Sequence, residues 1–169
     1  RTYGDYVGQY RKVMEKGLPS TATVTVQRPT GVVYDLTRQR KVDTRAQNGQ
    51  LLFEAALDGG AGNLFLVMDE PVGRLQITHP PTARRQGKLF FDVTLSHASG
   101  KPLQAAAPLQ VMIRDAQNKD VEGSGYYSLT NGKLTVELDI APNDVPGKWQ
   151  IEVQEGVSGQ KASGAFEVQ

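Results

Sequence analysis

The sequence predicts a mostly β protein, with a seven-stranded sandwich over residues 72–169 and a smaller β unit with one N-terminal helix over residues 1–71. Two observations predict this class. From Pro19 onward, apolar residues recur at every second position, which is the periodicity of strands. Beyond residue 72 these strand-like segments follow one another at regular spacing, which is typical of an all-β sandwich.

The composition fits this class. The chain of 169 residues has 38% hydrophobic residues, 18 Gly, 9 Pro and no Cys. An apolar fraction of this size is ordinary for a globular protein and excludes disorder, collagen and coiled coil. The length allows one large sandwich or two small domains. Without Cys, the chain has no disulfide, thiol nucleophile or zinc–thiolate site.

The charge balance bears on partners. There are 19 Lys and Arg residues against 18 Asp and Glu, a net charge of +1. Proteins that bind nucleic acid through phosphates carry a basic face, so we expect no nucleic-acid partner. Neither a membrane-spanning run nor a signal peptide is evident. Because the chain begins with Arg1, we interpret it as a mature protein or a piece of a longer one.

The elements of residues 1–71 can be taken in order. Four side chains lie on one side of an expected helix over Asp5–Lys16, and Gly17 and Pro19 supply its stop signals. A basic segment from Arg38 to Arg45 is interpreted as a solvated hairpin loop. The expected strands are Thr21–Arg28, Gly31–Leu36, Gln50–Leu57 and Leu64–Met68.

The last of these segments, Leu64–Met68, is a continuous apolar run, which favours a strand buried on both faces. Four strands and one helix make a thin unit. Residues 1–71 are therefore expected either to pack on the second half or to be the tail of a larger domain. Asp69 and Glu70, just before Pro71, are interpreted as part of the joint between the halves.

Residues 72–169 show the clearest alternation. Asn131-Gly132 between two strand-like runs predicts a type I′ hairpin turn, which needs a positive φ at both central residues. Trp149 shares its alternation with Ile151 and Val153, so we expect its ring in the core. The seven expected strands are Val72–Thr78, Gly87–Ser96, Pro108–Asp115, Gly123–Thr130, Lys133–Ile140, Lys148–Glu155 and Lys161–Val168.

The end of the chain carries a resemblance to a known family. Residues 143–155, with the string Pro-Gly-Lys-Trp-Gln-Ile-Glu-Val, and the closing Ala-Phe-Glu-Val resemble the last two strands of a macroglobulin-type domain. This immunoglobulin-like sandwich is repeated in proteins of the α2-macroglobulin family. The resemblance implies a structural or interaction module without an active site. In residues 1–71, Tyr34-Asp35-Leu36 is followed by a basic stretch and a second pair of strands, which is similar in style to the small β-domains appended to bacterial glycoside hydrolases.

Metal and catalytic sites find little support in the sequence. No serine lies in a nucleophile-elbow motif, and the Gly-rich segment Asp58–Asn63 reads as a hairpin loop. His79 and His97 lack the spacing of metal ligands. Oxygen-bearing side chains between Asp115 and Asp120 could in principle hold Ca²⁺, but a solvated turn explains them better. We therefore expect no catalytic residue, metal or cofactor.

Three functions remain for comparison. The first is a non-catalytic accessory or interaction module, a C-terminal part of a larger bacterial protein that is exported to the periplasm or the exterior. The second is a carbohydrate-binding module of a glycoside hydrolase, for which Tyr126 and Tyr127 are the candidate ligand-binding residues, because adjacent strand residues point to opposite faces and one ring must face outward. The third, an enzyme, would need a polar pocket containing His79 or His97.

Overall fold

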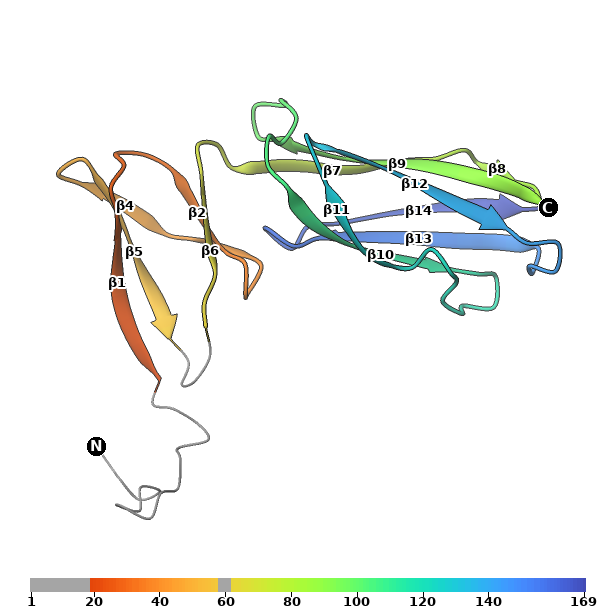
Figure 1. Cartoon of the computed structure of the whole chain (residues 1–169), viewed down its shortest axis with the longest axis horizontal. Coiled ribbons are helices and arrows are strands. Elements are labelled where there is room, and N and C mark those ends of the chain that lie inside the picture. The colour runs from red at the N-terminus through yellow and green to blue at the C-terminus, as the bar shows by residue number, and fades with distance from the viewer. Residues whose placement is uncertain (1–18, 58–61) are drawn as a thin grey trace, which may run out of the picture.

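A computed structural model describes residues 19–57 and 62–169, and within these residues all regular secondary structure is β (Figure 1). The expected helix over Asp5–Lys16 and most of the Asp58–Asn63 loop lie outside the described residues. No helix in the described part is long and apolar enough to cross a membrane.

The N-terminal unit consists of two three-stranded antiparallel sheets, in the orders β1-β5-β4 and β3-β2-β6. Four of its strands match the expected segments to within two residues at each end. Its strands are β1 (Ser20–Val26), β2 (Val32–Asp35), β3 (Arg40–Val42), β4 (Thr44–Gln47), β5 (Gln50–Leu57) and β6 (Phe65–Met68).

The prediction of a solvated hairpin loop between Arg38 and Arg45 is wrong. The short strands β3 and β4 lie in this segment, and each forms the edge of one sheet. Edge strands tolerate charged side chains, because only one side of the strand pairs with a neighbour. Arg40, Lys41 and Arg45 are exposed, while Val42 packs on the core of the unit. With so few apolar residues, the two strands show no apolar alternation from which they could be predicted.

The C-terminal unit has eight strands, one more than predicted. The extra strand β8 has two residues and pairs in parallel with β14 after the prolines at positions 80 and 81. Such a short strand has no periodic signal in the sequence. The strands are β7 (Val72–Thr78), β8 (Thr82–Ala83), β9 (Gly87–His97), β10 (Ala107–Arg114), β11 (Gly125–Leu129), β12 (Lys133–Ile140), β13 (Gly147–Glu155) and β14 (Lys161–Val168).

These strands form a three-stranded sheet, β12-β9-β7, and a five-stranded sheet, β11-β10-β13-β14-β8, whose inner faces enclose the main core. Trp149 is 1% exposed, as expected for a core residue. Its ring lies 5.8 Å from that of Phe166, and its Nε1 donates a hydrogen bond to the carbonyl of Val145. Asn131 and Gly132 have φ values of 52° and 74°, which confirms the predicted turn.

The β3-β2-β6 sheet is covered on both faces. Val33 of β2 belongs to a small core with Phe53 and its neighbours on β5, whereas Tyr34, the next residue, belongs to the core of the C-terminal sandwich. On β6 the alternation is the same, with Val67 facing the small core and Met68 the main one. β6 thus packs against other elements on both faces, as predicted, although only Met68 is fully buried and its other residues are half-buried.

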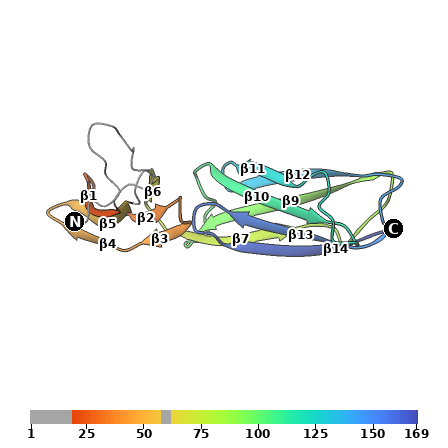
Figure 2. The same cartoon turned by 90° about the horizontal axis from the view of Figure 1, so that it is seen from below.

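The two units meet at one end of the elongated C-terminal sandwich (Figure 2). The Tyr34 hydroxyl accepts a buried hydrogen bond from the backbone N–H of Val72, at 2.9 Å. On the other side, the amide of Gln154 donates to the side-chain oxygen of Gln39 at 2.7 Å. Residues 19–71 thus pack on the second half, which is one of the two arrangements expected from the sequence.

Candidate functional site

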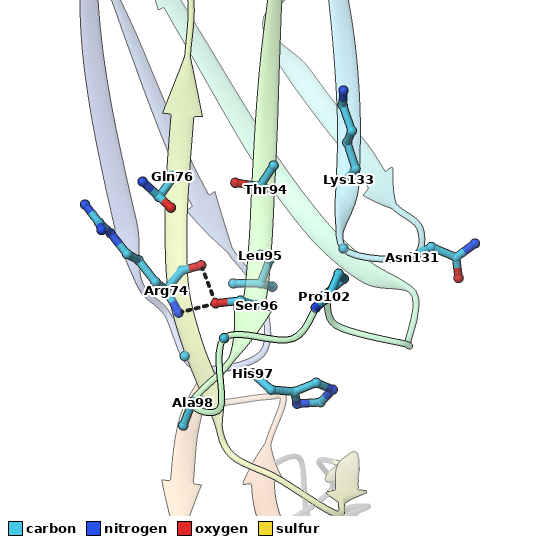
Figure 3. A pocket seen from close by; sticks show the side chains of 13 residues that line it. Arg74, Gln76, Thr94, Leu95, Ser96, His97, Ala98, Pro102, Asn131 and Lys133 are labelled. Carbon is cyan, nitrogen blue, oxygen red and sulfur yellow. Dashed lines mark hydrogen bonds between the residues drawn. The ribbon is translucent and has the colours of Figure 1, made fainter.

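A groove of about 700 Å³ opens on the outer face of the β12-β9-β7 sheet, at the end next to the N-terminal unit (Figure 3). Strands β7 and β9 supply its floor. The loop that follows β9 and the β11–β12 turn border it. Its polar side chains are Arg74, Gln76, Thr94, Ser96, His97, Asn131 and Lys133.

A β-bulge positions Arg74 at the groove. The pairing of β7 with β9 changes register between Val72 and Leu75. Ser96 then compensates for the disturbed ladder: its Oγ accepts a hydrogen bond from the Arg74 N–H at 3.2 Å and lies 3.5 Å from the Arg74 carbonyl (Figure 3). Bulges re-aim side chains in this way, often beside functional sites.

Gly73 explains how the two strands come so close at the bulge. A Cβ atom at this position would lie 2.3 Å from the carbonyl oxygen of His97, so only glycine fits without moving the backbone. The backbone that carries Arg74 is consequently fixed by a steric requirement as well as by the hydroxyl of Ser96.

The side chains that line the groove include basic residues and no acidic ones among the described residues. Lys133 is neutralised from outside, because its Nζ lies 2.9 Å from Oδ2 of Asp92. Hydrogen bonds from Lys133 and then from Thr135 hold the pKa of Asp92 below its usual value. Among the described residues, the Arg74 guanidinium has no ion-pair partner, so it supplies an uncompensated positive charge.

Beyond the groove, the same sheet face carries an exposed aromatic ring. Phe90 is 50% exposed and shares its side of β9 with Asp92 and Thr94, because alternate residues of a strand point the same way. Lys88, two positions before Phe90, forms an ion pair with Glu137 of β12. The hydrogen bond with Glu137, and then the charge of Asp139, raise the pKa of Lys88.

The structure separates the two candidate tyrosines. Tyr126 is 82% exposed on the outer face of β11, opposite Gln110. Tyr127 packs against the main core, and its hydroxyl donates to the carbonyl of Gly123 at 2.8 Å. As the alternation requires, one ring faces outward. Tyr126 lies on the five-stranded sheet, whereas the groove lies on the three-stranded one.

The two histidines occupy different surroundings. His79 lies against Gly164 of β14, where a Cβ atom would approach its Nε2 to 2.5 Å, so the imidazole fills the space that glycine leaves. His97 lies at the end of the groove, and its buried Nδ1 has no hydrogen-bond partner among the described residues. No carboxylate lines this groove, whereas Asp69 and Glu70 line a second cavity to which His97 also belongs.

The loop from Asp115 to Asp120 forms a closed turn. Oδ1 of Asp115 accepts hydrogen bonds from the backbone N–H groups of Gln117 and Lys119 at 2.8 and 2.9 Å. Asp120 lies 3.3 Å from Nε of Arg114. Within residues 19–57 and 62–169, no group of three His, Cys, Asp or Glu side chains is arranged to hold a metal ion.

A second cavity, of about 500 Å³, lies between β6 and the loop that follows β9. Asp69 and Glu70 line it, in the connection where the sequence analysis placed them. Asp69 forms an ion pair with Arg28, so the negative charge of Asp69 is balanced within the protein. Neither acid lines the groove of Figure 3, but His97 lines both the groove and this cavity.

Sequence reasoning did not find the groove. Its residues come from three strands, a loop and a turn that are separated along the chain, and their polar alternation looks like that of any solvated sheet face. The signal that was present is Gly73 inside a strand pattern, because an isolated glycine there often marks a bulge or a close backbone approach.

Comparison with known proteins gives no family. No family profile and no curated protein matches the chain. Among solved structures, the alkylpurine DNA glycosylase AlkC of Pseudomonas fluorescens, bound to DNA containing an abasic site analog, is similar with a TM-score of 0.35 and 16% identity. The match covers 59% of this chain and 30% of that chain. At this level the likeness assigns neither fold family nor function.

Proposed function

We propose that this chain is a non-catalytic accessory or interaction module of a larger exported protein, in which it holds neighbouring parts at a fixed spacing and orientation. The observation that supports this best is the β3-β2-β6 sheet, which is covered by the small core on one face and by the sandwich core on the other. A module built in this way transmits orientation from one end to the other.

The energetics of the joint support a fixed arrangement. Tyr34 is 3% exposed and Met68 is 7% exposed, and both belong to the main core. Burying a large apolar side chain contributes about 1.5–3 kcal/mol. Separating the units would expose both side chains and break the bond between Tyr34 and Val72. Relative motion of two domains is the default only where the interface is small or polar.

We further propose that residues 72–169 form a macroglobulin-type domain with an immunoglobulin-like sandwich. The strand order supports this assignment. In such sandwiches the first, second and fifth strands share one sheet, and the third, sixth and seventh share the other. Leaving the two-residue β8 aside, six strands divide in this way, with β7, β9 and β12 in one sheet and β10, β13 and β14 in the other. The fourth strand, β11, departs from the constant-type arrangement, because it pairs with β10 and not with the sheet of β7, β9 and β12.

An immunoblot of fractions from the native organism, with antibody raised against these 169 residues, tests the accessory role. We expect a band far above 18.4 kDa in the periplasmic or extracellular fraction. A band at 18.4 kDa would contradict the proposal that the module belongs to a larger protein. A cytoplasmic band would contradict export.

Carbohydrate binding is the second candidate, and the exposed rings of Tyr126 and Phe90 favour it. Aromatic rings offer a flat apolar face with a defined orientation, on which a sugar ring can stack. Affinity electrophoresis in gels that contain soluble polysaccharides tests this function directly. Retarded migration in at least one gel is expected, and unretarded migration across a broad panel would rule it out.

A further inference from the structure

We propose that the groove beside Arg74 binds a carboxylate-bearing glycan, with the Arg74 guanidinium pairing with a uronate carboxylate and Phe90 stacking against a sugar ring further along the chain. This inference rests on the second candidate function and names both its site and its ligand class. It also moves the expected binding face from Tyr126, on the five-stranded sheet, to the opposite sheet of the sandwich.

The charge of the groove selects an anion. Its described lining contains Arg74 and Lys133 and no acid. Because Asp92 already pairs with Lys133, the ligand's charge is left to Arg74. A guanidinium can bind a carboxylate through two parallel hydrogen bonds, which gives both strength and a defined orientation.

The other polar groups suit hydroxyl-rich ligands. Gln76 and Asn131 each carry an amide that donates and accepts, and Thr94 carries a hydroxyl that does the same. A sugar ring offers hydroxyl groups of the same double character. A peptide would instead be expected to pair with a strand edge or to fill apolar side-chain pockets. The lining therefore favours a glycan over an acidic peptide.

The position of Phe90 sets the length of the ligand. Phe90 precedes Thr94 by four residues on β9, which corresponds to about 13 Å at roughly 3.3 Å per residue. Both residues have the same orientation on the strand. A ligand that contacts Arg74 and Phe90 together must therefore be an oligosaccharide rather than a single sugar.

The backbone of Arg74, the residue proposed to bind the carboxylate, is already ordered without a ligand. The bulge between Val72 and Leu75, the close contact of Gly73 with His97 and the hydroxyl of Ser96 fix the backbone of Arg74. A backbone that is already ordered reduces the entropy lost on binding. Only the arginine side chain itself remains to be ordered.

Oligogalacturonate is the probe for the test, and the same oligosaccharide with its carboxylates reduced to alcohols is the matched neutral probe. Binding to the whole chain is measured by titration calorimetry. We expect binding of the acidic probe, with affinity at least tenfold weaker for the reduced probe and for Arg74→Gln, and weaker affinity for Phe90→Ala. Arg84→Gln, in the exposed segment between β8 and β9 and outside the groove, is the matched charge control and should bind as the parent does.

Several outcomes would overturn the inference. Unchanged affinity in Arg74→Gln, when its thermal unfolding equals that of the parent, would exclude Arg74 as the anchor. Loss of binding in Tyr126→Ala would move the site to the other sheet. Equal affinity for poly-glutamate would indicate charge attraction without glycan recognition. If the reduced probe binds as tightly as the acidic one, the proposed uronate site is wrong, but the protein still binds carbohydrate. If no polysaccharide gel retards the protein, both the uronate site and the carbohydrate-binding function are wrong.

Discussion

The hydroxyl of Tyr34 accepts a hydrogen bond from the backbone N–H of Val72, and this bond joins the second strand of the N-terminal unit to the first residue of the C-terminal sandwich. Tyr34 is 3% exposed and Val72 is 9% exposed, so water cannot easily replace either partner. The bond lies immediately after the connection between the units, and it supplies a buried acceptor for the backbone donor of Val72.

Tyr34→Phe tests this bond. The substitution keeps the ring in the core and leaves the Val72 N–H buried without an acceptor, which costs about 1–3 kcal/mol. The free energy of unfolding, measured in urea, should fall by this amount. Tyr126→Phe is the matched control, because its hydroxyl is on an 82% exposed side chain, and it should change stability little. Equal stability of the two variants would contradict the role of the joint bond.

Trp149 should serve as a probe of the core. It is the single tryptophan of the chain and is 1% exposed, so its emission in the native protein should be blue-shifted and should move to the red on unfolding. Because the ring is buried and packs against Phe166, added glycans should leave the emission spectrum unchanged even if they bind. A native spectrum typical of exposed indole would contradict the packing of β13.

Acid should weaken the N-terminal unit through Asp35. Burial raises the pKa of this carboxyl, but the hydrogen bonds and charge of Arg38, with the N–H of Thr37, outweigh burial and bring the pKa below the ordinary 3.8. The resulting stabilisation is complete above 3.8 and is lost as the pH falls through the lower pKa of the folded protein.

Asp35→Asn should therefore be less stable than the parent at neutral pH, with a difference that narrows as the pH falls below 3.8. Urea unfolding at a series of pH values measures this difference. A gap that stays constant across the series would show that the charge of Asp35 plays no part.

Glu155 stabilises the β13–β14 turn from a fully buried position. Its carboxylate is 0% exposed and accepts hydrogen bonds from the backbone N–H groups of Val157, Ser158 and Gln160 at 2.7–3.0 Å. Glu155→Gln would turn an acceptor into a donor facing these groups, so we expect a loss of about 1–3 kcal/mol or more.

Glu152→Gln is the matched control for this substitution. Glu152 lies on the same strand and pairs with Lys161 at the surface, and an exposed ion pair of this kind contributes about 0–1 kcal/mol. Thermal unfolding of the two variants should therefore differ clearly. If Glu152→Gln destabilises the protein as much as Glu155→Gln, the buried network is not what holds the turn.

The sequence predicted strands wherever apolar residues alternate over several positions. The segments over Lys133–Ile140 and Gln50–Leu57 were predicted with the bounds that the structure has, because one face of each strand is buried. β3, β4 and β8 are not predicted, for a physical reason. A strand of two to four residues at a sheet edge is held by its neighbour's backbone, and backbone pairing leaves no trace in the side-chain pattern.

The joint and the groove depend on contacts between distant residues. Tyr34 looks like any strand aromatic until the fold brings it to Val72, which is 38 positions away. Arg74 looks like a solvated strand residue until the fold places it in the lining of the same groove as Asn131 and Lys133, which lie across β9 from it. Periodicity predicts which side of a strand is buried, but it does not say which other element covers that side.

Because the β3-β2-β6 sheet packs against a core on each of its two faces, it limits where the gene can be cut by recombination. A chain divided after Pro71 would leave the sandwich without Tyr34 and Met68 and would leave β2 and β6 with a bare apolar face. Gene rearrangements that cut at this point would yield two products prone to aggregation. Recombination should therefore transfer residues 20–169 as one unit. Related proteins that arose by domain shuffling should contain both sheets of the N-terminal unit together with the sandwich, or none of these parts.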